Sequence, residues 1–185
     1  MQQTLIIYST TDGQTQRICE RLAQATDTSK LVSIKQAGDE TLTNYDQIVI
    51  GASIRYGKHQ PAVYQFIEKN RALLSKTKSA FFSVNVVARK PEKNTPETNP
   101  YMQKFLELTS WRPDILTVFA GRLNYPQYRF IDRFMIRLIM YMTKGPTDTS
   151  QTYEFTDWAR VDEFADTLAK QKLTMPSEKT MEIVL

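Results

Sequence analysis

The chain has 185 residues, of which 41% are hydrophobic, and a formal net charge of +4. This length fits one domain with a proper core, and the single cysteine, Cys19, excludes an internal disulfide and favours a reducing compartment. With one histidine and one cysteine, no metal site is expected. The sequence shows no secretion signal and no apolar stretch near the roughly 20 residues of a membrane span, so we expect a protein that is neither secreted nor membrane-spanning.

Strand-like and helix-like patterns alternate along the chain. Apolar strands are expected from Leu5 and at Leu31–Lys35, Gln47–Ala52, Ser79–Val86 and Ile115–Gly121. Helices are expected from Gln14, from Pro61, over Tyr101–Leu108 and after a cap at Thr156 or Asp157. Five strands alternating with helices predict an α/β fold with a parallel sheet that is covered on both faces.

The loop Ser9–Thr15 follows the first strand and leads directly into a helix. Its hydroxyl side chains and the free N–H groups of the helix N-terminus favour a phosphate. Because the loop has no lysine and neither Walker A nor G-x-G-x-x-G spacing, it resembles the phosphate loop of flavodoxins, which holds the monophosphate of FMN. Asp12 stands where flavodoxins usually carry a Thr and brings a negative charge. A capped turn that binds no ligand is the alternative interpretation.

With this loop after the first strand, we expect a flavodoxin-like sheet of order 2-1-3-4-5, with the ligand beyond the carboxyl ends of the strands. The second loop at this edge, Ser53–His59, offers Tyr56 for stacking on a flavin and Arg55 as a cation near its N1 and C2=O edge. An ordinary strand-end turn would account for the same residues. His59, the only histidine, is expected to be a surface residue rather than a catalyst because it has no defined partner.

The third loop at this edge, Asn85–Pro100, is long for a βα connection, which usually takes about 2–6 residues. Long loops at the active edge of a sheet are often lids or specificity elements, and the first part of this loop is basic. A solvated, flexible insertion is the alternative.

The segment Arg122–Lys144 carries five cations and one carboxylate, and a plain flavodoxin needs no helix at this place. At about 100° per residue, its cations from Arg129 onward fall within about 80° of one another, with apolar side chains on the opposite side. This pattern suits an anionic membrane surface or an apolar partner with acidic rims, the alternative being a helix packed on the core. The residues expected to meet the membrane are Arg129, Arg133, Phe134, Arg137, Leu138 and Tyr141.

Five stretches, Ser9–Thr15, Ile50–Gly57, Ser83–Lys93, Trp111–Asp114 and Arg129–Met140, are informative together. They resemble the flavodoxin-like, quinone-dependent protoporphyrinogen oxidases of bacteria. The resemblance extends to about Leu168, and its second and third stretches are specific enough to separate this family from electron-carrier flavodoxins. We expect one domain over residues 1–172, with insertions at about 86–100 and 122–150, and a tail at 173–185.

The resemblance implies FMN as cofactor, protoporphyrinogen IX as electron donor and a membrane quinone, menaquinone or ubiquinone, as acceptor. Six electrons would leave the substrate in three two-electron steps, in haem biosynthesis, with the flavin performing the redox step. The residues assigned to the cofactor are Ser9, Thr10, Thr11, Asp12, Gly13, Gln14, Thr15, Ser53, Ile54, Arg55, Tyr56, Gly57, Val84, Asn85, Val86, Val87 and Ala88. The residues matched to the substrate propionates are Arg89, Lys90, Arg122 and Arg129.

The expected location is the cytoplasmic side of the bacterial inner membrane, bound peripherally, with the next haem-pathway enzyme as a further partner and no nucleic acid. Two other functions stay open, an electron-carrier flavodoxin and a flavodoxin-like NAD(P)H:quinone reductase. The basic net charge argues against the carrier, because such carriers are usually acidic. An NAD(P)H oxidation assay would decide about the reductase.

Overall fold

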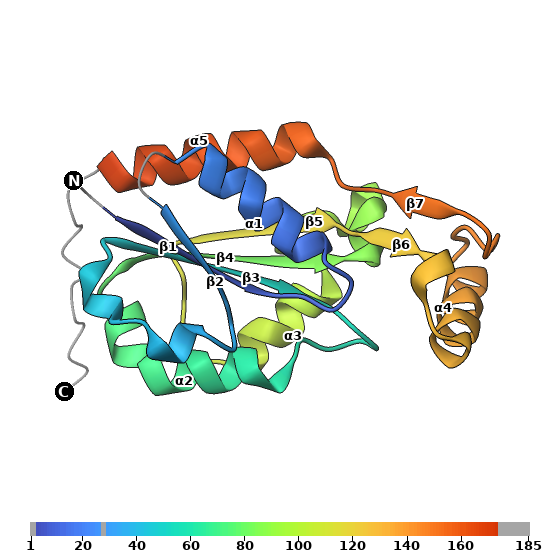
Figure 1. The fold of residues 1–185 in the computed structure, drawn as a ribbon, viewed down its shortest axis with the longest axis horizontal. Coiled ribbons are helices and arrows are strands. Elements are labelled where there is room, and N and C mark those ends of the chain that lie inside the picture. Colours follow the sequence, from blue (N-terminus) through green and yellow to red (C-terminus); the bar gives the residue numbers. More distant parts are fainter. Residues whose placement is uncertain (1–2, 27–28, 174–185) are drawn as a thin grey trace.

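A computed structural model describes residues 3–26 and 29–173 of the chain, and in these residues five strands form one parallel sheet (Figure 1). Their order is β2-β1-β3-β4-β5, which confirms the predicted topology. The strands are β1 (Thr4–Ser9), β2 (Ser29–Ser33), β3 (Gln47–Ser53), β4 (Lys78–Asn85) and β5 (Ile115–Ala120). β2 begins two residues before its predicted start. The predicted tail at 173–185 lies, except for Leu173, outside the described residues.

Helices cover both faces of the sheet, as the alternating pattern predicts. Figure 1 shows α1 (Gln14–Gln24) and α5 (Trp158–Leu173) over one face, and α2 (Pro61–Leu74) and α3 (Pro100–Leu108) over the other. Asp157 caps α5, since its Oδ1 accepts hydrogen bonds from the backbone N–H groups of Ala159 and Arg160. None of the helices in the described residues has the length and hydropathy that crossing a bilayer requires.

Successive residues of the central strands enter opposite halves of the core, because side chains alternate across a strand. Leu5 and Ile7 of β1 join the cluster that packs against α2 and α3, whereas Ile6 joins Phe82 in the cluster against α1 and α5. Gly51 of β3 makes this packing possible, because a Cβ at that position would lie 2.2 Å from the Phe82 ring. The core thus fixes the strand ends from which the functional loops emerge.

An insertion follows β5 and lies beyond the carboxyl ends of the strands (Figure 1). It consists of β6 (Arg122–Asn124), the 3-10 turn η5 (Tyr125–Gln127), helix α4 (Phe130–Met142) and β7 (Thr152–Glu154), which pairs antiparallel with β6. A separate apolar cluster holds α4 in place, formed by Leu123, Tyr125, Tyr128, Ile136 and Met140. The additional helix predicted after the fifth strand is confirmed.

Shorter 3-10 turns complete the described chain. Two precede β3, namely η1 (Ala37–Asp39) and η2 (Leu42–Asn44). Two follow β4, namely η3 (Val86–Arg89) and η4 (Pro91–Lys93). The long third loop is therefore built from short turns rather than from extended chain.

Candidate functional site

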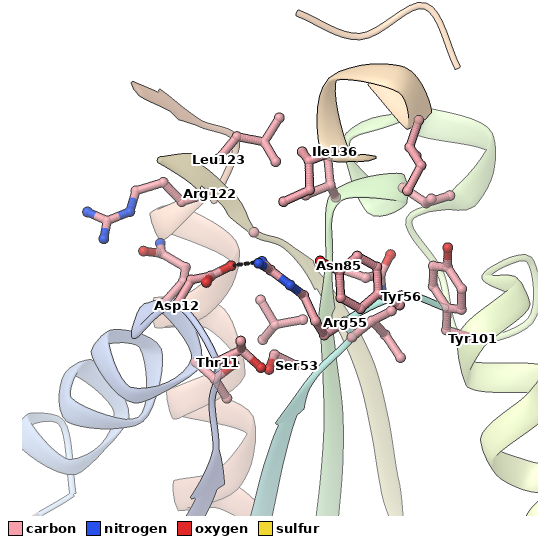
Figure 2. Close-up of a pocket in the computed structure, with 18 of the residues that line it drawn as sticks. Thr11, Asp12, Ser53, Arg55, Tyr56, Asn85, Tyr101, Arg122, Leu123 and Ile136 are labelled. Carbon is pink, nitrogen blue, oxygen red and sulfur yellow. Dashed lines mark hydrogen bonds and ion pairs between the residues drawn. The ribbon is translucent and has the colours of Figure 1, made fainter. Parts of the chain in front are cut away.

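One pocket lies where the three loops meet at the carboxyl edge of the sheet (Figure 2). The space between its walls, including the part open to solvent, is about 830 Å³. The predicted residues that line it are Thr10, Thr11, Asp12, Gln14, Thr15, Ser53, Ile54, Arg55, Tyr56, Gly57, Val84, Asn85, Val86, Val87 and Arg122. Those that do not line it are Ser9, Gly13, Ala88, Arg89, Lys90 and Arg129. Sequence reasoning missed the lining residues Tyr101, Gly121, Leu123, Tyr128, Ile136, Ile139 and Met140.

The first loop has the features of an anion site. Gly13 precedes α1 at a φ of 81°, and no side chain caps the first turn of this helix. Three hydroxyl oxygens at this edge are buried without a hydrogen-bond partner in the described structure, those of Ser9, Thr15 and Ser53. A buried polar group left unpaired is costly, so the two of these hydroxyls that line the pocket, those of Thr15 and Ser53, indicate a ligand that accepts hydrogen bonds from them. The loop therefore fits the phosphate of a flavin.

Asp12, the departure from the flavodoxin pattern, is neutralised within the protein. Its Oδ2 accepts a hydrogen bond from Arg55 Nη1 at 2.8 Å and another from the Tyr128 hydroxyl at 3.3 Å (Figure 2). Burial raises the pKa of Asp12 above its ordinary value, while the Arg55 guanidinium acts in the opposite direction. The carboxylate is thus engaged with Arg55 and Tyr128, which removes the expected conflict with a phosphate.

The second loop turns tightly and presents an aromatic ring. Arg55 and Lys58 exchange backbone hydrogen bonds, with Tyr56 at a φ of 50° and Gly57 at 79° between them. Both central residues adopt the left-handed conformation, which is typical of a two-residue turn. The Tyr56 side chain is 50% exposed and its hydroxyl donates a hydrogen bond to Asp132. This turn gives the pocket a flat wall on which a planar ligand can stack.

The third loop is a structured wall of the pocket. Asn85 Oδ1 accepts hydrogen bonds from Ala88 N and from Asn99 Nδ2, at 3.0 and 3.1 Å. Asn99 Oδ1 in turn accepts the N–H groups of Tyr101 and Met102 at the start of α3. The two asparagines close the base of the loop, which favours the interpretation as an element of the site over the alternative of a solvated, flexible insertion.

Arg89, one of the residues matched to the substrate propionates, has partners within the protein. Its Nη1 donates to Val86 O at 3.0 Å, and its Nη2 donates to Thr143 O at 3.0 Å. Burial lowers the pKa of Arg89 from its ordinary value. The guanidinium therefore ties the third loop to the C-terminal end of α4, and Arg89 does not line the pocket.

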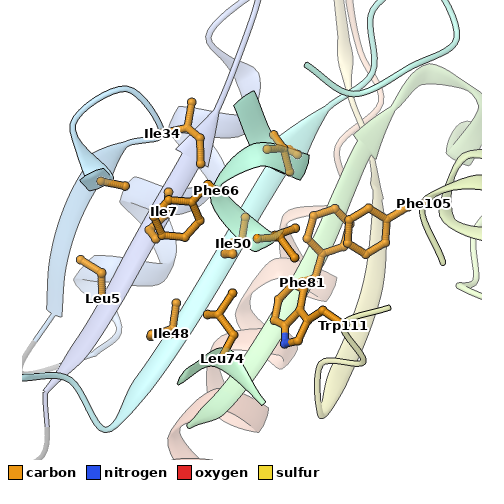
Figure 3. Close-up of a cluster of buried hydrophobic side chains, with 14 of the residues drawn as sticks. Leu5, Ile7, Ile34, Ile48, Ile50, Phe66, Leu74, Phe81, Phe105 and Trp111 are labelled. Atoms are coloured by element: carbon orange, nitrogen blue, oxygen red, sulfur yellow. The ribbon is translucent and has the colours of Figure 1, made fainter. Parts of the chain in front are cut away.

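The prediction that His59 lies on the surface is wrong, because the residue is buried and only 2% exposed. Its Nε2 lies 3.1 Å from Ser83 Oγ, and its ring meets Phe81 and Phe105 edge-on. Figure 3 shows Phe81 and Phe105 stacked beside Trp111 in the core. Burial lowers the pKa of His59 to about 4, so the ring is neutral at neutral pH. Its surroundings make it a core residue, and it does not line the pocket.

Helix α4 has two apolar faces. The inner face contributes Ile136, Ile139 and Met140 to the pocket. The outer face exposes seven large apolar side chains by 39–83%, namely Phe130, Ile131, Phe134, Met135, Leu138, Tyr141 and Met142. Arg133 departs from the expected cationic stripe, because it is half-buried and its guanidinium donates to the carbonyls of Tyr125, Pro126 and Tyr128. The exposed cations of this segment are Arg129, Arg137 and Lys144.

Comparisons with known proteins were made for sequence and for fold. A family described as a flavodoxin domain matches residues 5–150. A curated Escherichia coli K12 protein named protoporphyrinogen IX dehydrogenase [quinone] is 48% identical over 170 residues, covering 90% of this chain and 94% of that protein. A Leishmania major protein of the same name is 44% identical over 177 residues, covering 93% and 77%.

Solved flavodoxins share the fold at low sequence identity. Oxidised flavodoxin 2 from Bacillus cereus has a TM-score of 0.53 at 16% identity, over 91% of this chain and 99% of that chain. Oxidised flavodoxin 1 from the same organism has a TM-score of 0.52 at 14% identity, over 91% and 97%. The pocket at the carboxyl edge of the sheet therefore lies on a flavodoxin fold.

Proposed function

The chain belongs to the flavodoxin domain family and matches quinone-dependent protoporphyrinogen IX dehydrogenases over 90% of its length, and we propose that it has their activity. In this proposal it oxidises protoporphyrinogen IX to protoporphyrin IX, with FMN as cofactor and a quinone as electron acceptor. Bound FMN supplies two-electron transfer between the donor and the acceptor. The observation that carries the proposal is the 48% identity to a curated enzyme, together with a pocket built from the three loops.

The choice of FMN over FAD rests on the first loop. The unpaired hydroxyl of Thr15, which lines the pocket, and the helix N-terminus after Gly13 suit one phosphate group. The loop has no G-x-G-x-x-G turn for a pyrophosphate. In the second loop, Tyr56 supplies a stacking surface for the flavin. The left-handed backbone of Tyr56 places its phenol ring at the pocket wall.

The substrate side of the pocket is apolar with a cationic rim. Val86, Val87, Leu123 and Ile139 form a surface for a large apolar macrocycle. Arg122 also lines the pocket, and its guanidinium makes no hydrogen bond within the described residues, so we assign it to a substrate propionate.

We further propose that α4 binds the cytoplasmic face of the membrane. A continuous exposed apolar face on one helix is unusual for a water-facing surface, and α4 combines it with exposed Arg129, Arg137 and Lys144. Anionic lipid headgroups would pair with the cations while the apolar side chains enter the interface. A quinone dissolved in the bilayer would then be close to the pocket that the inner face of α4 lines.

The proposed activity is tested by anaerobic turnover of purified, FMN-loaded protein. We expect fluorescent protoporphyrin to form from protoporphyrinogen only when a quinone is added. NADPH in place of protoporphyrinogen is expected to give no quinone reduction. Steady NADPH oxidation without porphyrin formation would instead identify an NAD(P)H:quinone reductase.

A further inference from the structure

Asp132 is the single carboxylate in the basic segment Arg122–Lys144, and it belongs to the first turn of α4. Unlike its neighbours on the outer face of the helix, it meets the second loop. Its Oδ1 accepts a hydrogen bond from the Tyr56 hydroxyl, and its Oδ2 lies 3.3 Å from Arg55 Nη2. The hydrogen bond from Tyr56 holds the pKa of Asp132 below its ordinary value, so the group is charged at neutral pH.

Arg55 is held between two carboxylates from different parts of the chain. Asp12 of the first loop binds one end of the guanidinium at 2.8 Å, and Asp132 of α4 binds another at 3.3 Å. The rings of Tyr56 and Tyr128 flank it, with their centroids 5.2 and 5.0 Å from Cζ. The Arg55 side chain is 19% exposed and lines the pocket with Asp12, Tyr56 and Tyr128, whereas Asp132 contacts Arg55 and Tyr56 without lining the pocket itself. Figure 2 shows Asp12, Arg55 and Tyr56 at this wall.

We propose that Asp132 is a positioning residue that holds Arg55 and Tyr56 against the pocket from α4 and sets the charge that the flavin experiences. This inference rests on the flavin site of the proposed function. Asp12 and Asp132 offset the charge of Arg55, with Arg122 also acting on Asp12 and Arg129 on Asp132. Loss of the Asp132 charge would leave a more positive wall, and positive charge near a flavin stabilises its reduced, anionic form.

The test is the reduction potential of the bound flavin, measured by equilibrium redox titration. Asp132→Asn removes the charge but keeps an oxygen that can accept the Tyr56 hydroxyl. We expect it to favour the reduced flavin about tenfold, a rise of about 30 mV for a two-electron couple. Asp132→Glu, which restores the charge, is expected to return the potential toward that of the wild type.

Asp148→Asn is the matched control, because Asp148 is an exposed carboxylate of the same insertion that bonds Ser150 and does not line the pocket. It makes the same change of charge and is expected to leave the potential unchanged. The inference is overturned if Asp132→Asn, folded by circular dichroism and holding its flavin, has the wild-type potential, or if Asp148→Asn raises the potential equally. Should Asp132→Asn not fold, Asp132→Ser is measured against the same two outcomes.

The titration also separates this inference from the proposed function. It needs neither protoporphyrinogen nor quinone, so a protein that shows the expected shift but does not oxidise protoporphyrinogen would support the inference and contradict the proposed substrate. A wild-type protein that binds no flavin would overturn both.

Discussion

Thr15→Val is expected to make the flavin-free protein more stable and its binding of FMN weaker. Thr15 is fully buried at the second residue of α1, and its Oγ1 has no partner in the described structure. An unsatisfied buried polar group costs about 1–3 kcal/mol, and valine replaces the hydroxyl by a methyl group of similar shape. The free energy of unfolding of the flavin-free protein should therefore rise by about 1 kcal/mol.

In the proposed FMN site, the same substitution removes a donor to the phosphate. A hydrogen bond to a charged group contributes about 1.5–3 kcal/mol, which corresponds to a loss of affinity of about 10-fold to 150-fold. The two effects have opposite signs because the hydroxyl is satisfied only when the ligand is bound. A purely structural hydroxyl would instead lower stability when removed and leave the affinity unchanged.

Urea titration of flavin-free protein and quenching of FMN fluorescence measure the two effects. Thr4→Val is the control, since Thr4 is equally buried at the other end of β1 but donates a hydrogen bond to Gln47 Oε1 at 3.1 Å. This control is expected to lose stability and keep its FMN affinity. The reasoning is refuted if Thr15→Val behaves like Thr4→Val.

Three further predictions follow from the remaining geometry. Burial lowers the pKa of His59 to about 4, below the unfolded value of about 6.5, so the folded protein loses stability as the pH falls from the higher value to the lower one. Urea titrations at pH 6.5 and 4.5 should therefore show that the free energy of unfolding drops by about 2–3 kcal/mol less in His59→Gln than in the wild type. Equal drops in the two proteins would contradict this. Replacing Arg129, Arg137 and Lys144 by Glu removes about 1 kcal/mol of attraction to anionic lipid per charge. The triple variant should no longer sediment with anionic vesicles but should still reduce a water-soluble quinone. Unchanged sedimentation would show that the outer face of α4 does not meet the membrane through these cations. Arg122→Gln should raise KM for protoporphyrinogen about tenfold, the equivalent of one charge-assisted hydrogen bond, and leave KM for a soluble quinone unchanged. An unchanged KM for protoporphyrinogen would show that Arg122 does not bind the substrate.

The sheet topology was predictable because local patterns decide it. Leu5–Ile7 and Ile48–Ile50 are continuously apolar, and a parallel strand buried on both faces requires this pattern. The hydroxyl loop Ser9–Thr15 then located the ligand edge, because it lies between a strand and a helix. These signals depend on neighbours in the sequence and were therefore visible without a structure.

The partners of individual side chains were not predictable, because distant segments supply them. Arg89 donates a hydrogen bond to Thr143, 54 residues away in the sequence. Asp132 accepts one from Tyr56, 76 residues away. Helical periodicity placed Arg133 on a cationic stripe, but the carbonyls that bind it belong to the preceding turn and are not part of the helix. A single carboxylate in a strongly basic segment was the one signal for Asp132.

Anaerobic mixing of the FMN-loaded protein with protoporphyrinogen IX tests the proposed function most directly. We expect the flavin absorbance to be bleached by protoporphyrinogen and to recover when a quinone is added, with protoporphyrin as the product. A flavin that stays oxidised in the presence of protoporphyrinogen, in protein that binds FMN, would contradict the account.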